Sequence, residues 1–189
     1  MAARILIVLA ALACAAVLLV PHVSGGQART SASPCGAVAL EPGEVGIERA
    51  RQLTLCLLNR ERARHGLAPL QPRAQLQLAS QRHTDDMIVR HFFEHDAPDG
   101  TDPQRRMLIA GYPSNNAITG ENIAWATGSA GTPAAIVDLW MHSPPHRENI
   151  LRPQFTEIGV GIARGAPQTP RSDATPWTYT TDFGGPPIR

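Results

Sequence analysis

Three residues that could do chemistry lie far apart in the sequence, each in a short polar motif. His95 follows a Phe-Phe-Glu run, Glu121 lies within Gly-Glu-Asn, and His146 follows the double proline Pro144-Pro145. Two neutral imidazoles and a carboxylate are a suitable ligand set for zinc or another divalent ion. The same groups can instead form a hydrogen-bond network in which the carboxylate fixes the tautomers of the rings. The residue types leave both alternatives open.

Ser143 lies close to His146 and offers a hydroxyl group, so a serine hydrolase has to be considered. Two prolines, Pro144 and Pro145, separate the serine from the histidine in the sequence, and the sequence contains no recognisable oxyanion hole. We therefore expect Ser143 to contribute to a polar cavity rather than to act as an activated nucleophile.

A second histidine pattern, H-x-x-E-H, spans His91 to His95. In zinc enzymes with this pattern, two histidines one turn apart bind the metal and the glutamate is the base. That arrangement needs a continuous helix through His95, whereas Asp96 to Gly100 is rich in turn-forming residues. We expect the helix to end before His95. His83, on the apolar stripe of the same helix, is expected to be packed and hydrogen-bonded rather than a ligand.

The elements that position these residues can be predicted from periodicity and from boundary signals. Proline starts a helix well and glycine commonly follows its end. The pattern predicts helices over 47–65, 72–90 and 103–110, a fourth that begins at 133, and a short fifth that begins at 144. Apolar alternation predicts strands over 155–163 and 177–183, which can pair as a hairpin, and an extended or irregular segment over 120–125.

Composition excludes one class of function and favours a single globular domain. The 189 residues are 43% hydrophobic, which suits one domain with its own core. The formal net charge is +1 and only 5% of residues are aromatic. Neither a basic surface nor a base-stacking platform is therefore expected, which argues against nucleic-acid binding.

The N-terminus has the pattern of a secretory signal peptide. Arg4 precedes an apolar run over 5–20, and small residues follow, so residues 1–28 are predicted to be a signal peptide with cleavage near Gly25 or Ala28. No stable membrane span is expected after cleavage, and the protein is predicted to be secreted or extracytoplasmic. Residues 29–46 are predicted to be a linker or a partly ordered leader.

Cys35 and Cys56 are the two cysteines that remain after cleavage. An even pair in an oxidising compartment favours one disulfide, which would tie the leader to the first helix. The alternative is a free thiol at Cys35 and a small buried apolar side chain at Cys56.

Several of these motifs occur together in a characteristic order. They are Phe92-Phe93-Glu94-His95, Gly120-Glu121-Asn122-Ile123-Ala124, the stretch from Trp140 to Leu151, and Ile158-Gly159-Val160-Gly161. In this respect the chain resembles a bacterial member of the CAP superfamily (SCP-like domain; cysteine-rich secretory proteins, antigen five and plant pathogenesis-related proteins). The resemblance extends from about Leu53 to Gly184. It implies an α+β fold over residues 47–189, an α-β-α sandwich with a small antiparallel sheet between helical layers.

The resemblance also implies a cavity built by His95, Glu121 and His146. A second glutamate found in fuller versions of the family site is missing, and Ser143 stands nearest its place. A divalent metal such as zinc, held by the two histidines and the glutamate, is the cofactor that this set suggests. Asn122 and Asn149 are expected to support the site by hydrogen bonds to loop backbone.

The resemblance implies a binding function rather than one particular reaction. We expect a secreted domain that binds a lipid or a cell-envelope component in the His/Glu cavity. The alternatives are a metal-dependent hydrolase acting on peptide or cell-wall polymer, and a non-catalytic structural or interaction module. Arg147, next to His146, could pair with Glu148 or Glu157 or be solvated.

Overall fold

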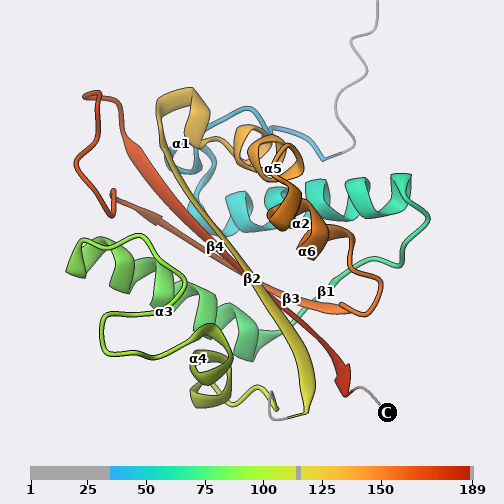
Figure 1. Cartoon of the computed structure of the whole chain (residues 1–189). Coiled ribbons are helices and arrows are strands. Elements are labelled where there is room, and N and C mark those ends of the chain that lie inside the picture. The colour runs from blue at the N-terminus through green and yellow to red at the C-terminus, as the bar shows by residue number, and fades with distance from the viewer. Residues whose placement is uncertain (1–34, 114–115, 188–189) are drawn as a thin grey trace, which may run out of the picture. The chain divides into compact units, whose positions relative to one another are not determined.

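The computed structural model describes residues 35–113 and 116–187, which form an α-β-α sandwich (Figure 1). A four-stranded sheet is the middle layer, and helices cover both of its faces. This confirms the predicted fold class. The predicted signal peptide, residues 1–28, and the first part of the predicted leader lie outside the described residues.

The element order begins with helices and ends with a pair of strands. The helices are α1 (Pro42–Val45), α2 (Ile47–Arg64), α3 (Ala74–Arg90), α4 (Pro103–Ile109), α5 (Pro133–Met141) and α6 (Pro144–Leu151), with a 3-10 turn, η1 (Gly128–Gly131). The strands are β1 (Gln71–Pro72), β2 (Ala117–Thr127), β3 (Glu157–Arg164) and β4 (Pro176–Pro187). None of the described helices is both long and apolar enough to span a membrane.

The sheet has the order β1-β3-β4-β2 and is mixed rather than purely antiparallel. β3 and β4 form the predicted antiparallel hairpin, and β2 pairs antiparallel with the other side of β4. β1 pairs parallel with β3, so the expectation that Pro72 starts the second helix was wrong by two residues. Pro72 needs no N–H there, because the neighbouring Gln71 and Arg73 donate to the carbonyls of Thr156 and Ile158.

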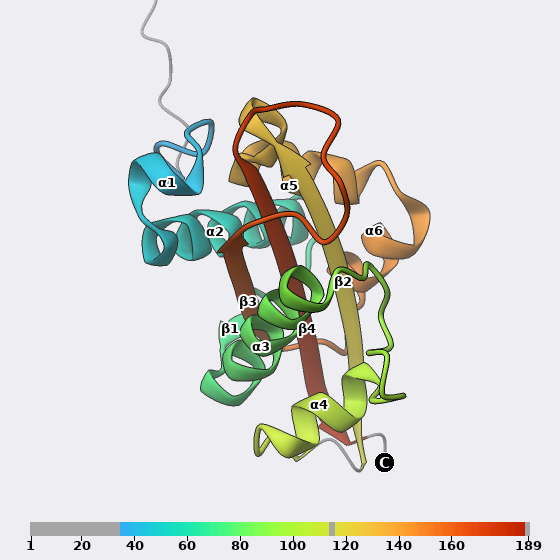
Figure 2. The same ribbon diagram turned by 90° about the vertical axis from the view of Figure 1, so that its left-hand side faces the viewer.

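Alternation along the strands gives the sheet one apolar and one more polar face. The apolar face includes Ile158, Val160 and Ile162 of β3 and packs against the layer of α2, α5 and α6. α3 lies against the opposite face, with α4 beside it (Figures 1 and 2). Gly159 and Gly161 of β3 face α3, and a Cβ at either position would overlap the α3 backbone. The helix can therefore lie directly on the strand, which brings its side chains close to β4 and β2.

A buried arginine on α2 fixes the position of α6. The Arg62 side chain is almost fully enclosed, and it donates hydrogen bonds to four main-chain carbonyls, at Ala68, Ile150, Arg152 and Phe155. Two of these carbonyls lie at the end of α6 and just beyond it. Arg62 therefore satisfies backbone acceptors that the helix leaves unpaired.

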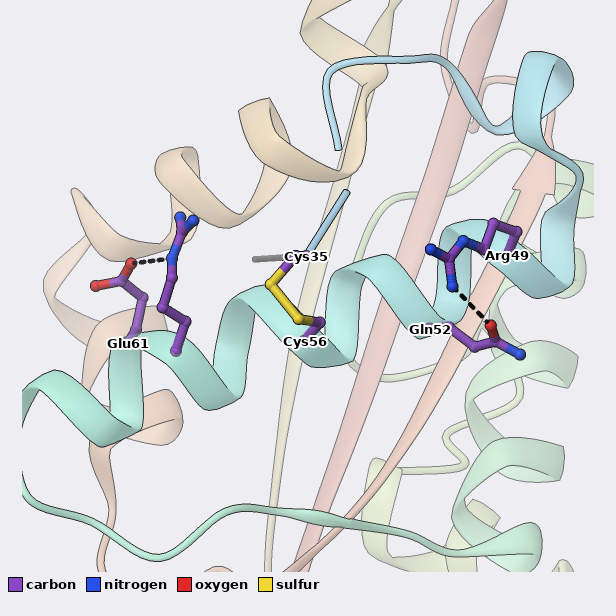
Figure 3. Close-up of a disulfide and its surroundings, with 6 residues drawn as sticks. Cys35, Arg49, Gln52, Cys56 and Glu61 are labelled. Carbon is purple, nitrogen blue, oxygen red and sulfur yellow. Dashed lines mark hydrogen bonds and ion pairs between the residues drawn. A yellow bond between two sulfur atoms is a disulfide. The ribbon is translucent and has the colours of Figure 1, made fainter. Parts of the chain in front are cut away.

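The predicted disulfide between Cys35 and Cys56 is confirmed (Figure 3). It joins the start of the described chain to the middle of α2, with 5.7 Å between the two Cα atoms. The leader also contains α1, which the sequence did not predict. Glu41, just before α1, accepts a hydrogen bond from Nε1 of Trp177 on β4, so this part of the leader is fixed to the domain.

Candidate functional site

Glu121 on β2 is the centre of the polar cluster. Its side chain is only 2% exposed, and three basic side chains surround its carboxylate. Oε1 lies 2.8 Å from Nδ1 of His95, and Oε2 lies 2.6 Å from a terminal nitrogen of Arg106. Nε2 of His83 lies 3.8 Å from Oε1. The buried negative charge is thus matched by groups from three separate segments of the chain.

The local structure explains why His95 points into this cluster. α3 ends at Arg90, and His91 adopts a left-handed conformation with φ 55°, which turns the chain away from the helix axis. His91 and His95 therefore do not lie on one helix, and the H-x-x-E-H zinc motif is excluded. The turn places His95 beside β2 instead.

Arg106 reaches Glu121 from α4, whose start is capped by Asp102. Oδ1 of Asp102 accepts a hydrogen bond from the backbone N–H of Arg105 at 2.7 Å, so Asp102 is the N-cap of this helix. The Arg106 side chain also donates to the carbonyl of Thr101, so both of its terminal nitrogens are used. Its guanidinium is therefore held in one orientation toward the carboxylate.

The contacts of Glu121 determine the charge of the cluster. Burial opposes ionisation, but the hydrogen bond with His95 and the electrostatic influence of His83 and Arg106 outweigh it and lower the pKa of Glu121. In return, the hydrogen bond with Glu121 raises the pKa of His95 above its ordinary value. His83 is fully buried, and burial lowers its pKa. Glu121 is therefore an anion that favours a protonated His95.

Asp182 on β4 is a second carboxyl group directly across the sheet from Glu121. It is 1% exposed, and neither of its oxygens has a hydrogen-bond donor among the described residues in their standard protonation states. Burial, together with the neighbouring charge of Glu121, raises the pKa of Asp182 well above its ordinary value. A protonated Asp182 can donate to Glu121, so the two carboxyl groups share one proton and one negative charge.

Ser143 and His146 contact each other, although two prolines separate them in the sequence. The Ser143 Oγ atom lies 2.8 Å from Nδ1 of His146. Ser143 is the N-cap of α6 but makes no capping hydrogen bond. An N-cap serine usually accepts from the second or third N–H of its helix, and Pro145 removes the first of these donors. The hydroxyl bonds to the imidazole instead.

His146 differs from His95 in its electrostatic environment. Burial and the charge of His95 lower the pKa of His146, so its ring favours the neutral form. The charge of His95 therefore affects the protonation of His146 through an electrostatic interaction. Their Nδ1 atoms have separate partners, Glu121 for His95 and Ser143 for His146.

Asn122 and Asn149 join β2 to α6, through backbone acceptors in the strand and the helix rather than in loops. Nδ2 of Asn122 donates to the carbonyl of His146 at 3.0 Å. Nδ2 of Asn149 donates to the carbonyl of Glu121 and to Oδ1 of Asn122. Both side chains hydrogen-bond to backbone, which fixes the strand that carries Glu121 relative to the helix that carries His146.

An open pocket of about 290 Å³ lies over part of this cluster. Most of its lining residues have polar side chains; the lining comprises His95, Asp102, Pro103, Gln104, Thr119, Gly120 and Glu121. Ser143 and His146 do not line it. The structure thus brings His95 and Glu121 into one pocket and leaves the Ser143–His146 pair outside its lining.

The arrangement does not fit the three-ligand metal site that the residue types suggested. Among the described residues, no group of three or more His, Cys, Asp and Glu side chains is placed to share one ion. Both oxygens of Glu121 already accept hydrogen bonds, and the guanidinium of Arg106 would repel a cation beside them. Glu121 is instead positioned to orient His95.

Three residues of the cluster were not identified as site residues from the sequence. His83 was expected to be packed and hydrogen-bonded, and its Nε2 does contact the carbonyl of Glu94, but it also lies beside Glu121. A weak signal existed for Asp182, because the alternation of Tyr179 and Phe183 on β4 places it on the opposite face. The sequence held no signal for Arg106, since its partner comes from another element.

Most of this chain matches a known protein family. The model of the cysteine-rich secretory protein (CAP) family matches residues 55–179, well over half of the chain. Two curated relatives come from Bacillus subtilis (strain 168). Uncharacterized protein YkwD is 40% identical over 105 residues, which are 56% of this chain and 39% of the relative. Uncharacterized membrane protein YlbC is 34% identical over 113 residues, which are 58% of this chain and 30% of the relative. The match therefore spans less than half the length of either relative.

Solved structures share the fold. An outer surface protein from Borrelia burgdorferi aligns with a TM-score of 0.60 at 17% identity, over 77% of this chain and 96% of that one. An extracellular protein containing an SCP domain from Bacillus anthracis aligns with a TM-score of 0.55 at 27% identity, over 72% and 42% of the two chains. The family match and the shared fold together show that this chain belongs to the CAP family of cysteine-rich secretory proteins.

Proposed function

We propose that this CAP domain acts outside the cytoplasm and binds a polar component of the cell envelope in the pocket at His95 and Glu121. The observation that carries the proposal is an open pocket whose floor holds a buried, fixed carboxylate and a half-exposed imidazole. Binding sites commonly combine a preformed cavity with a few oriented polar groups.

The lining of the pocket favours a ligand rich in hydroxyl and amide groups. His95, Asp102, Gln104 and Thr119 offer hydrogen-bond donors and acceptors to this pocket. An acyl chain would cover these polar side chains without offering them hydrogen-bond partners, which costs free energy. Of the two ligand classes expected from the sequence, a cell-wall glycan or peptide therefore suits this pocket better than a lipid.

His95 is the residue best placed to contact such a ligand. Its side chain is 51% exposed, and its Nδ1 atom is held by Glu121. Nε2 is left for a ligand, and the raised pKa of His95 favours a ring that donates from this atom. Glu121 is a poor general base, because two donors hold it and its pKa is lowered, so we propose binding rather than catalysis.

An extracytoplasmic location is consistent with the disulfide and with the signal-like N-terminus. Disulfides persist in oxidising compartments and are rare in the cytosol. Cys35 and Cys56 form such a bridge. One relative of the same fold is described as an extracellular protein.

The test is binding of the secreted protein to purified cell-wall fragments, measured by calorimetry with soluble fragments and by sedimentation with intact walls. His95→Ala should weaken binding at least about tenfold, since one lost hydrogen bond to a charged donor is worth about 1.5–3 kcal/mol. His142→Ala is the matched control, because that ring is 79% exposed and does not line the pocket.

Equal binding by wild type and His95→Ala would show that the ligand does not bind in this pocket. A folded wild type that binds no wall fragment would contradict the proposed function. A Glu121→Ala variant that loses stability but keeps its affinity would favour the alternative of a purely structural polar cluster.

A further inference from the structure

A second and larger pocket, of about 750 Å³, lies along α6 and is separate from the His95–Glu121 pocket. Pro144, Arg147, Glu148 and Leu151 line it from one face of the helix, at helical spacing. The end of α5 and the segment 152–154, which follows α6, complete the lining. The pocket shares no lining residue with the first, so it needs its own explanation.

Arg147 presents an uncompensated charge to this pocket. Its terminal nitrogen lies 3.1 Å from Nε2 of His65, not beside Glu148 or Glu157. Nδ1 of His65 lies 2.8 Å from the carbonyl of Glu61, which can only accept, so Nδ1 carries the proton and Nε2 accepts from Arg147. The guanidinium is therefore held in place by a neutral ring and keeps its full positive charge.

Arg152 is a second positioned cation on the same pocket. Its guanidinium carbon lies 5.5 Å from the centroid of the Phe155 ring, in a cation–π contact. Within residues 35–113 and 116–187, no carboxylate forms an ion pair with Arg147 or Arg152. Both guanidinium groups are therefore held in place without a neutralising carboxylate.

The rest of the lining is largely apolar. Met141, Pro144, Leu151 and Pro153 contribute carbon surface, and Glu148 is the single acidic residue of the lining. The charged residues therefore leave an excess of positive charge beside an apolar surface. A guanidinium matches the oxygens of a phosphate group with paired N–H donors, and two of them balance the charge of a phosphate monoester.

We propose that this pocket binds an organic phosphate that carries an apolar chain. The phosphate contacts Arg147 and Arg152, and the chain lies on Met141 and Leu151. The proposal goes beyond the envelope-binding function proposed above and does not depend on it, because the two pockets use different residues.

Calorimetry with octyl phosphate tests this inference on the secreted protein. The double variant Arg147→Gln/Arg152→Gln should bind octyl phosphate at least tenfold more weakly than wild type. The variant Arg164→Gln/Arg171→Gln removes the same charge from exposed positions elsewhere and should bind within about twofold of wild type, since distant surface charges are screened. Melting temperatures of all variants establish that each is folded.

Two further ligands separate the parts of the proposal. Inorganic phosphate carries the head group alone, and octyl glucoside carries the same chain on an uncharged sugar head group. Both should bind more weakly than octyl phosphate. Octyl glucoside binding as tightly as octyl phosphate would overturn the role of the arginines, as would unchanged binding by the double glutamine variant. Equal binding of inorganic phosphate would overturn the role of the apolar surface. A His95→Ala variant should bind octyl phosphate like wild type, which keeps this test independent of the first pocket.

Discussion

Glu121 and Asp182 are adjacent carboxyl groups, of which Glu121 is ionised and Asp182 is protonated. Their different neighbours account for this difference. Glu121 has His95, Arg106 and His83 around it, which lower its pKa despite burial. Asp182 has no such donors, so burial dominates and its pKa is raised. The pair therefore carries one proton, on Asp182, and one negative charge, on Glu121.

This arrangement predicts that Asp182 destabilises the folded state increasingly as the pH rises. The unfolded chain releases the Asp182 proton near pH 4, whereas the folded protein retains it to a higher pH. The folded state then binds more protons than the unfolded state, so this residue lowers stability as pH rises above about 4. Asp182→Asn keeps a donor for Glu121 without that cost, so the melting temperature of the variant relative to wild type should increase between pH 4 and pH 8.

Thermal unfolding followed by circular dichroism across this pH range provides the measurement. Asp138→Asn is the control, because Asp138 is 73% exposed and should show no comparable trend. A difference between Asp182→Asn and wild type that stays constant from pH 4 to pH 8 would contradict the assignment of the proton to Asp182.

His95 and His146 also show how neighbours separate two residues of the same type. The hydrogen bond with Glu121 raises the pKa of His95, while burial and the charge of His95 lower the pKa of His146. At a pH near the ordinary histidine pKa, His95 favours the charged form and His146 the neutral form. The site therefore offers a cationic donor and a neutral imidazole within one small region.

At the scale of elements, the contact of α3 with β3 brings His83 close to Glu121. The helix approaches so closely because Gly159 and Gly161 have no side chains. Gly159→Ala should destabilise the fold by about 3 kcal/mol or more, since its methyl group would overlap main-chain atoms that no change of rotamer can move. Urea unfolding gives the free energy directly.

Gly66→Ala is an informative comparison, because an added Cβ at Gly66 meets no atom within 4 Å but the residue has φ +69°. It should lose only the roughly 1–2 kcal/mol expected for a left-handed backbone conformation. Similar losses in both variants would show that contact with α3 is not what makes Gly159 necessary.

The long elements could be predicted because their signals are local. Pro103, Pro133 and Pro144 begin helices at the predicted positions. α1 and β1 could not be predicted, because four and two residues are too few to show a period.

Part of the site followed from the sequence as well, since His95 and Glu121 meet as the motifs and the family resemblance suggested. The partners that set their charges could not be found in this way. Asp182 meets Glu121 only through the register of β2 with β4, and Arg106 arrives from α4. Both are contacts between distant segments, which no local pattern encodes.

At the scale of the whole described domain, the disulfide ties the leader to α2. Replacing both cysteines, Cys35→Ala/Cys56→Ala, should lower the free energy of unfolding by about 3 kcal/mol, because the bridge closes a loop with a sequence separation of 21. Urea unfolding of the variant and of wild type with reductant should give similar midpoints, both below that of oxidised wild type. An unchanged midpoint in the variant would mean that other contacts, such as Trp177 with Glu41, already fix the leader.

The two proposed ligand pockets draw on different parts of the domain. The first uses the loop after α3, α4 and β2, whereas the second uses the end of α5 and one face of α6. Asn122 and Asn149 connect β2 with α6, so the elements behind the two pockets are joined by hydrogen bonds. Because the two pockets share no lining residue, a ligand can bind in one without displacing a lining residue of the other.

The side chains that hold β2 in place have a further effect on how copies of this protein meet. β2 is the outer strand of the sheet, and an open outer strand can recruit a strand from another molecule. Here the Asn149 side chain donates a hydrogen bond to the carbonyl of Glu121, and the Trp140 side chain donates one to the carbonyl of Ile123. The opposite edge is only two residues long and contains Pro72. These contacts at both edges thus protect the sheet from pairing with the sheet of another copy of this protein.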